Sequence, residues 1–418
     1  MARAIPVLVI WGLGLTQIIG FGTLYYAFGV LAPAIAADFG WAEPWLFGLF
    51  SAAVLAGGLV APLIGGWADR FGAARVMSIG ALLVALSLAG CAIAPEPLAY
   101  GAGLLSAELA SGAVLYAIAF TALTQWSGGT GAPRAITLLT LIGGFASTLF
   151  WPFTAWLLDA FGWRGVHLVF AGLHLAICLP IHLLVARHAP ARGATTETAA
   201  ASDIISPTND IEPIVAQRLL LLGFGLIGFT LAAVLVHMVP TLTALGLGSS
   251  ALVVSSLFGP AQVLARLANM QFGRRLSQLW LAVIAAGCLP LAILVLIGSS
   301  PSLAGALVFA LLFGVGSGLS SIVSGTLPLV LFGREGYGRR VGAIGAARAI
   351  ASAFAPVLFA VGVSLFSAAL ALGLTAAAAL GALACFCRIA WLDTRPVAFP
   401  RRPRAAKTAA SHDQRRVS

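Results

Sequence analysis

The sequence predicts an all-α membrane protein with twelve transmembrane helices in two pseudo-symmetric six-helix bundles. The composition indicates a membrane protein, because 60% of the 418 residues are hydrophobic and only 9% are charged, against about 25% charged residues in soluble proteins. The long uncharged segments indicate helices, since a helix needs about 20 apolar residues to cross a bilayer. Strands of a membrane barrel would instead alternate apolar and polar residues.

Six apolar segments precede a polar central stretch and six follow it. The first six are expected to form helices over residues 7–35, 45–66, 76–94, 98–124, 135–158 and 165–186. The second six are expected over residues 218–240, 250–272, 279–298, 303–332, 341–366 and 368–391. This division predicts an N-terminal bundle over residues 1–186 and a C-terminal bundle over residues 218–391.

The remaining segments lack the composition of a folded domain. Residues 187–217 are rich in Ala, Thr, Ser, Pro and acids without periodicity, which predicts a flexible linker. Residues 392–418 predict a disordered basic tail. The five cysteines all lie in apolar segments, so we expect no disulfide framework. Near the N-terminus, Arg3 precedes an apolar run without a clear cleavage site, which predicts a retained first helix.

Basic residues set the expected orientation. With the N-terminus in the cytoplasm, nearly all of the 23 Lys and Arg residues fall in cytoplasmic loops, the linker or the tail, and Arg164 falls outside. Because short cytoplasmic loops carry the excess of bases, we predict a multi-pass protein of the bacterial inner membrane with a cytoplasmic linker and two cytoplasmic termini. Topology thus explains the net charge of +10, and no nucleic-acid partner is expected.

A charged turn lies between the second and third apolar segments. It contains Gly65, Asp69, Arg70, Gly72 and Arg75. Charged side chains between two hydrophobic spans must lie in water at a bilayer face, and the glycines permit a sharp reversal and close helix contact. We therefore expect a short loop that joins two membrane helices.

The spacing Gly-x-x-x-Asp-Arg-x-Gly followed by a base resembles the signature loop between helices 2 and 3 of the major facilitator superfamily. Gly-Trp-Arg at residues 162–164 is similar to that family as well, while Ala73 and Ala74 stand where the family often carries bases. The resemblance implies the major facilitator fold and secondary active transport by alternating access. It also implies that Asp69 contacts neighbouring helix ends and gates the conformational change by stabilising the outward-open state.

Three charged residues lie well inside the predicted helices, more than four residues from either end, namely Glu108, Arg266 and Arg348. Each costs at least a few kcal/mol in a bilayer, so it is rarely kept without a use or a partner. The two arginines are expected at a similar depth with no acid in their own half, and an anion between them would remove their repulsion. A guanidinium also matches a carboxylate bidentately. The alternative for each arginine is an interfacial position or a bond to backbone carbonyls.

The segment from Tyr337 to Pro356, with Gly345 and Arg348, resembles the eleventh helix of the oxalate:formate antiporter and monocarboxylate transporter group. In that group a cation on this helix faces an arginine of the eighth helix, and together they hold the substrate carboxylates. The resemblance implies that Arg348 and Arg266 bind substrate. Arg266 lies closer to the following Gly-Arg pair than the corresponding arginine of that group.

Glu108 is the only acid within a predicted helix, and its own half offers no base within a helix. We predict that it couples transport to protons. It would either pair with an arginine across the cavity when substrate is absent or hold a proton, because burial favours the neutral carboxyl. The alternative is a neutral glutamate that bonds a neighbouring helix. His237 is a weaker candidate for proton transfer.

Other polar side chains come from two helices that line the cavity in this superfamily. We predict substrate contacts for Gln17, Tyr25 and Tyr26 of the first helix and for Ser320 and Ser324 of the tenth. The serines repeat at a spacing of three or four residues, so they form one helix face. Neighbouring glycines make close helix packing an equal interpretation of that face.

Three functions are compatible with these features. The first is a secondary transporter of a small, carboxylate-like organic anion, coupled to protons or exchanging anions. The second is an exporter of drugs or other xenobiotics, which would favour membrane acids over bases. The third is a sensor, for which an additional folded domain is expected. No enzyme activity, catalytic residue, cofactor or metal is predicted, and without a Gly-x-x-x-x-Gly-Lys loop we expect no ATP-driven transport. We favour the anion transporter and expect a monomer.

Overall fold

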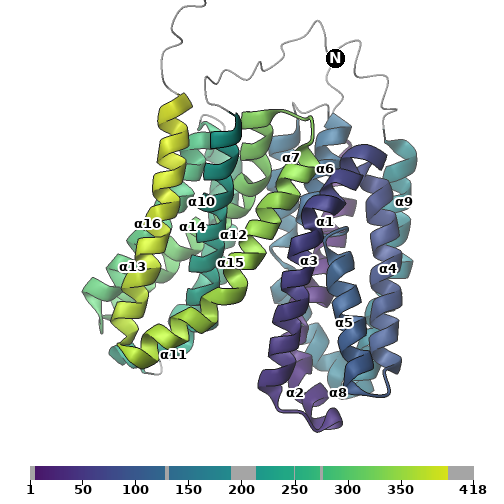
Figure 1. Cartoon of the computed structure of the whole chain (residues 1–418), viewed down its shortest axis with the longest axis horizontal. Coiled ribbons are helices and arrows are strands. Elements are labelled where there is room, and N and C mark those ends of the chain that lie inside the picture. Colours follow the sequence, from purple (N-terminus) through teal and green to yellow (C-terminus); the bar gives the residue numbers. More distant parts are fainter. Residues whose placement is uncertain (1–4, 128–130, 190–212, 249, 274–275, 394–418) are drawn as a thin grey trace, which may run out of the picture.

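The computed structural model describes residues 5–127, 131–189, 213–248, 250–273 and 276–393. Within these residues the chain forms two helical bundles that stand side by side (Figure 1). The N-terminal bundle, drawn in purple to blue, contains α1 to α9. The C-terminal bundle, drawn in teal to yellow, contains α10 to α16. The predicted all-α membrane fold is confirmed.

The helices agree closely with the expected spans. The N-terminal bundle contains α1 (Val7–Phe21), η1 (Gly22–Tyr26), α2 (Phe28–Phe39), α3 (Glu43–Phe71), α4 (Ala73–Ile93), α5 (Pro97–Ser111), α6 (Tyr116–Ser127), α7 (Ala132–Gly143), α8 (Ala146–Leu173), η2 (His174–Cys178) and α9 (Leu179–His188). The C-terminal bundle contains α10 (Pro213–Val236), α11 (Met238–Leu242), η3 (Thr243–Leu247), α12 (Ser250–Phe272), α13 (Gln278–Ser299), α14 (Leu303–Phe332), α15 (Tyr337–Leu365) and α16 (Ala368–Asp393). Elements named η are π-helical turns.

Eleven helical segments of the described chain are long and apolar enough to cross a membrane. One of them, Ala132–His188, has 57 residues and breaks at Gly162, where φ is 65°. It therefore supplies two crossings, which makes twelve within the described residues. Helices α9 and α10 extend into both ends of the predicted linker, whose residues 190–212 lie outside the described chain, as does the predicted tail beyond Asp393.

Several crossings are interrupted at positions where no break was expected. The π turn η1 divides the first crossing, residues 112–115 divide the fourth, and residues 144–145 divide the fifth. Irregular backbone at membrane depth is tolerated only where its polar groups find other partners or line a cavity. Gln17 supplies such a partner, because its amide nitrogen donates to the backbone oxygen of Val114 at 2.9 Å.

The two bundles touch at one end, which we name the loop face because it carries the turn at Gly72. There α3 packs directly along α15. A Cβ atom placed on Gly65 would lie 2.0 Å from the backbone oxygen of Gly338, and one on Gly342 would lie 2.4 Å from that of Ala61. Glycines without side chains thus allow the two backbones to meet.

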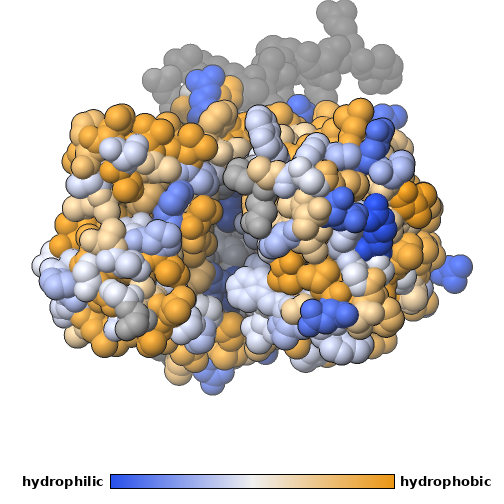
Figure 2. All heavy atoms as spheres, turned by 90° about the horizontal axis from the view of Figure 1, so that it is seen from below, coloured by the Kyte–Doolittle hydropathy of each residue, from blue (hydrophilic) through white to orange (hydrophobic). Residues whose placement is uncertain are grey.

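At the opposite end the bundles diverge. Figure 1 shows α15 and α3 moving apart below their contact, and Figure 2, seen from that end, shows a hollow between the halves with hydrophilic atoms inside it. The described conformation is therefore closed at the loop face and open at the opposite end.

The contact between Gly65 and Gly338 generates a prediction about this closure. We expect Gly65→Ala to push the bundles apart at the loop face, because the added methyl group meets backbone that cannot rotate away. The distance between spin labels at Arg134→Cys and Glu335→Cys should increase in double electron–electron resonance.

Gly66→Ala is the matched control, since a Cβ atom at Gly66 has no neighbour within 4 Å. Both substitutions gain the same helix propensity, about 0.5–1 kcal/mol. Identical label distances in the two variants would show that the glycine contact does not control closure.

Candidate functional site

Asp69 joins the two bundles at the loop face. Its two carboxylate oxygens accept hydrogen bonds from the backbone nitrogens of Gly338 at 2.8 Å and Arg339 at 2.9 Å. These nitrogens belong to the first turn of α15, where backbone N–H groups have no partner in their own helix and the helix dipole favours an anion. We name this contact, formed by Gly65, Asp69, Gly338, Arg339 and Gly342, the loop-face gate.

The turn that presents Asp69 is fixed by its neighbours. Gly72 has φ of 98°, a backbone conformation that L side chains rarely adopt. Gln125 of α6 bridges the turn, because its amide donates to the backbone oxygen of Ala68 and accepts from the nitrogen of Ala73, both at 2.9 Å. Sequence reasoning missed Gln125, which lies more than 50 residues from its partners.

The two bases of the turn lie beside the loop-face gate. The guanidinium of Arg70 stacks over the ring of Phe71, 5.3 Å from its centroid. Arg75 is exposed at the start of α4. The structure therefore brings Asp69 and Gly65 of the predicted gating loop into the contact between bundles, with Gly72 shaping the turn.

Arg266 crosses between the bundles at a second point. Its guanidinium donates to the backbone oxygen of Thr140 in α7 at 2.9 Å, to that of Gly318 in α14 at 3.4 Å and to the side-chain oxygen of Gln262 at 3.4 Å. The side chain is buried. Gly144 makes room for it, because a Cβ atom there would lie 2.4 Å from an arginine nitrogen. In this conformation Arg266 therefore bonds to backbone carbonyls.

Arg348 lies on α15, facing the other bundle. It is half-buried, and it interacts electrostatically with Tyr25 of η1. Tyr25 also interacts electrostatically with Glu108 of α5, and its side chain is 55% exposed. The structure thus brings Arg348, Tyr25 and Glu108, which come from both bundles, into one electrostatic cluster.

The two arginines lie at different distances from the ends of their helices. Arg348 lies roughly 16 Å from the start of α15 and Arg266 roughly 9 Å from the end of α12, at a rise of 1.5 Å per residue. The expectation of similar depth was based on an eleventh helix beginning at residue 341, whereas α15 begins at Tyr337. Arg348 therefore lies farther along its helix than expected.

Aromatic rings surround this cluster. Tyr26 meets Tyr25 and Trp151 edge to face, with centroid distances of 5.4 and 5.8 Å. Tyr26 and Tyr116 both interact electrostatically with Arg266. Of the two tyrosines of the first crossing, Tyr25 therefore interacts with Arg348 and Tyr26 with Arg266.

Glu108 is buried where α5 meets α3, and Gly57 permits this approach, since a Cβ atom there would lie 2.4 Å from the backbone oxygen of Glu108. Among the described residues Glu108 has no ion-pair partner. It lines a small cavity of about 20 Å³ inside the N-terminal bundle, together with Thr23 and His167. This volume suffices for one water molecule.

The remaining predicted substrate contacts are buried in helix packing. Gln17 is fully buried against Val114. Ser320 and Ser324 donate to the backbone oxygens of Ser317 and Ser321 in their own helix, both at 2.8 Å. In this conformation these three side chains are buried and donate to backbone oxygens.

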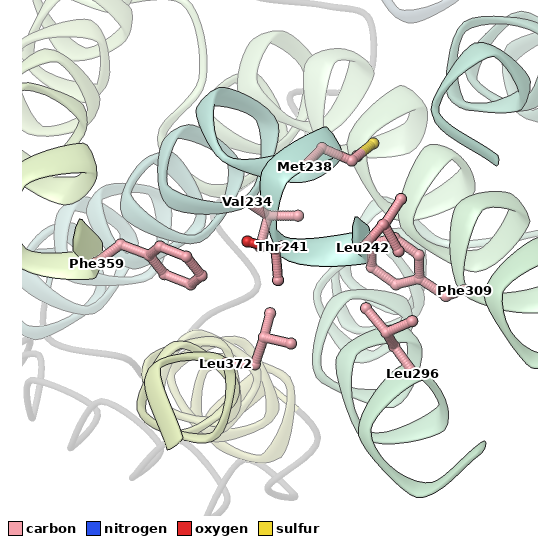
Figure 3. A pocket seen from close by; sticks show the side chains of 8 residues that line it. All are labelled: Val234, Met238, Thr241, Leu242, Leu296, Phe309, Phe359 and Leu372. Carbon is pink, nitrogen blue, oxygen red and sulfur yellow. The ribbon is translucent and has the colours of Figure 1, made fainter. Parts of the chain in front are cut away.

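A second cavity lies in the C-terminal bundle near the end away from the loop face. Figure 3 shows the side chains around it: Val234, Met238, Thr241, Leu242, Leu296, Phe309, Phe359 and Leu372. Its volume is about 10 Å³, at the lower limit for one water molecule, and Thr241 supplies its one polar side chain. This cavity is a packing feature of the bundle.

The fold defines a multi-pass helical membrane protein. A profile of the Major Facilitator Superfamily matches residues 13–356. The chain belongs to this superfamily of transporters, which bind small-molecule substrates and are embedded in the lipid bilayer, so it is a transporter rather than an enzyme. No curated protein matches the chain as a close relative in sequence.

Solved transporters share the fold. The human organic anion transporter MFSD10 (TETRAN) is 19% identical with a TM-score of 0.70, and covers 91% of this chain and 98% of its own. The E. coli fucose:proton symporter FucP, in the outward conformation, is 14% identical with a TM-score of 0.71 and the same coverage. The proton:xylose symporter XylE, bound to 6-bromo-6-deoxy-D-glucose, is 14% identical with a TM-score of 0.66, covering 91% and 95%.

The Asp69 contact predicts the behaviour of Asp69→Asn. An amide offers one acceptor oxygen without a negative charge, so the loop-face gate loses a charge-assisted bond worth about 1.5–3 kcal/mol. We expect a larger fraction of molecules open at the loop face and slower transport, with substrate binding retained. The spin-label distance defined above reports the opening.

Asp159→Asn serves as the control, because Asp159 lies in α8 at the other end of the bundle. Loss of binding in a folded Asp69→Asn protein would place Asp69 in the substrate site and contradict its role in the gate.

Proposed function

We propose that this protein is a secondary active transporter of a small organic anion with a carboxylate group, coupled to protons. The observation that carries the proposal is the position of Arg348. Its half-buried guanidinium lies where the two bundles separate, and it interacts electrostatically with Tyr25 of the other bundle. A cation inside a membrane-spanning helix is rarely kept without a partner, and an anion would neutralise its charge. The planar fork of arginine matches a carboxylate.

Arg266 is proposed as the second anion ligand, acting after the loop-face gate opens. Its bond to Thr140 joins the two bundles, so it must break when they separate at the loop face. The freed donors then gain more from a carboxylate than from water, because charge-assisted hydrogen bonds are the stronger ones. Tyr25 and Tyr26 complete the proposed site between the arginines.

Glu108 is the proposed proton-coupling residue. It is buried, without an ion-pair partner among the described residues, and within electrostatic range of Tyr25, which also senses Arg348. The free energy of ionising this carboxyl therefore depends on whether Arg348 holds an anion. Similar folds serve an organic anion transporter and two proton symporters, so both parts of the proposal are compatible with the fold.

The proposed orientation places the loop face in the cytoplasm. The excess of bases in the loops of that face supports this orientation. The described conformation is then the outward-open state, and the protein is a multi-pass protein of the bacterial inner membrane.

The anion site predicts graded effects at Arg348. We expect Arg348→Gln to weaken carboxylate binding at least roughly tenfold, because one charge-assisted hydrogen bond is worth about 1.5–3 kcal/mol. Arg348→Lys should retain part of the affinity, since a point charge replaces the fork. The measurement is thermal stabilisation of the purified proteins by formate, lactate, oxalate and benzoate.

Arg388→Gln is the control, because Arg388 lies in α16 of the same bundle and stacks on Trp391, away from the site. If Arg348→Gln folds and binds these anions with unchanged affinity, the anion site lies elsewhere and drug export becomes the better hypothesis.

Proton coupling predicts a separate effect at Glu108. Glu108→Gln resembles the protonated side chain and cannot release a proton. We therefore expect accumulation of the labelled carboxylates driven by a pH gradient to fall at least tenfold in proteoliposomes. Counterflow at equal pH, which needs no net proton movement, should stay within twofold of the wild-type rate.

Glu96→Gln is the control here, since Glu96 is exposed at the start of α5. Undiminished pH-driven accumulation by Glu108→Gln would remove Glu108 from the coupling mechanism.

A further inference from the structure

Three buried histidines form a column through the N-terminal bundle. His167, His174 and His182 are at most 4% exposed, and they lie on α8, η2 and α9. They span fifteen residues, roughly 22 Å of helix at 1.5 Å per residue, out of a hydrocarbon core of about 30 Å. Burying an imidazole in a membrane costs free energy, so such a residue is rarely kept without a function or a partner.

A π turn keeps the histidines on one face. His167 and His174 are seven residues apart, close to two α-helical turns. His174 and His182 are eight residues apart, which would rotate the second ring off that face in a regular helix. The π turn η2, His174–Cys178, takes in one more residue than an α turn and restores the alignment.

The column meets Glu108 through Thr23. The cavity lined by Glu108 is also lined by Thr23 and His167, and it can hold one water molecule. The hydroxyl of Thr23 lies 2.9 Å from Nε2 of His174. Thr23 itself belongs to the π turn η1, so this bond joins two π turns, and such turns are frequent at functional sites.

At its other end the column approaches the loop face. Nδ1 of His182 lies 3.1 Å from the backbone oxygen of Met77, one turn inside α4. His174 and His182 interact electrostatically. Nδ1 of His174 and Nε2 of His182 are buried and have no hydrogen-bond partner among the described residues, so each retains capacity to exchange a proton.

We propose that Thr23, His174 and His182 relay protons between Glu108 and the loop face. The relay rests on the proposed role of Glu108 in coupling. The carboxyl of Glu108 releases its proton to a water in the cavity and becomes a carboxylate. The hydroxyl of Thr23 donates to the backbone oxygen of Ile19 at 2.9 Å in the described conformation. In the relay it turns to Nε2 of His174 and passes its proton there while it accepts one from that water.

The resulting imidazolium of His174 releases its Nδ1 proton, which reaches Nε2 of His182. His182 then releases its Nδ1 proton toward Met77 and the solvent at the loop face, and both rings return to neutrality. Net movement is one proton from Glu108 to solution, and each ring has exchanged its Nδ1–H bond for an Nε2–H bond.

The relay is interrupted in the described conformation. His174 and His182 do not bond to each other directly, because the facing nitrogens lack partners in the described chain. Glu108 meanwhile interacts electrostatically with Tyr25. A continuous path from the hollow to the loop face would let protons cross without substrate. An interrupted path is therefore expected in the state that is closed at the loop face.

Other ionisable groups lie on the elements around this column. The elements packed against it contribute Asp38 from α2, Cys91 and Arg75 from α4, Tyr100 and Glu108 from α5, and Tyr25 and Tyr26 from η1. The elements of the column itself contribute Asp159 and Arg164 near one end, Cys178 in η2, and Arg187 and His188 at the other end. Arg75, Arg187 and His188 lie at the loop face, where released protons meet solvent.

The test uses Thr23→Val, His174→Gln and His182→Gln in proteoliposomes with labelled formate, lactate, oxalate and benzoate. We expect pH-driven accumulation to fall at least tenfold in each variant, while counterflow at equal pH stays within twofold of wild type. Thr23→Ser keeps the hydroxyl and should accumulate within threefold of wild type. His237→Gln is the matched control, because His237 bonds a helix carbonyl in the other bundle.

Several results would overturn the relay. It is wrong if His174→Gln and His182→Gln fold and accumulate at the wild-type rate, or if Thr23→Val behaves as Thr23→Ser does. Equal loss of counterflow and accumulation in all three variants would assign these residues a structural role instead. If the wild-type protein exchanges carboxylates without responding to pH, the proposed relay is wrong and the proposed anion site is unaffected. One that moves none of the four anions contradicts the proposed function itself.

Discussion

The contact between the Asp69 carboxylate and the first turn of α15 determines which groups of this molecule face water and which face each other. Backbone N–H groups at a helix start have no partner in their own helix, and here the other bundle supplies it. When the loop face opens, water replaces the carboxylate as the partner of these N–H groups. The groups therefore have hydrogen-bond partners in both the closed and the open state. Closure is then one of two comparable arrangements, which is the condition for a protein that must alternate between them.

The same contact places two similar arginines in different surroundings. With α3 and α15 held together, Arg266 reaches Thr140 across the interface, while Arg348 faces the part of the molecule where the bundles separate. Backbone carbonyls satisfy the donors of Arg266 without neutralising its charge, so an anion that displaces them gains Coulomb energy as well as hydrogen bonds. A ligand shifts a conformational equilibrium only through such differential affinity.

The sequence allowed the helices and the Asp69 loop to be predicted because hydropathy and charge are local properties of the chain. The breaks at η1 and after Ser111 could not be predicted, since they depend on partners such as Gln17 for Val114, 97 residues apart. The partner of Arg266 is 126 residues away, and nothing near either residue marks the contact. The histidine column was detectable as three polar residues in one apolar span. Formal charge does not reveal the histidine column, because neutral imidazoles do not interrupt a hydrophobic segment as arginines do.

Two residues of one π turn connect the features of the N-terminal bundle. Thr23 points into the bundle, where it meets His174 and lines the cavity of Glu108, whereas Tyr25, two positions on, is exposed toward Arg348. Gly22 at the start of the turn lies directly against Phe150, which a Cβ atom would approach to 2.1 Å, so the turn is held closely to α8. Since cores are close-packed and do not deform continuously, a shift of η1 must move Thr23 and Tyr25 together. A displacement of Tyr25 would therefore alter the hydrogen bond to His174, which provides a short physical link between the proposed anion site and the proposed relay.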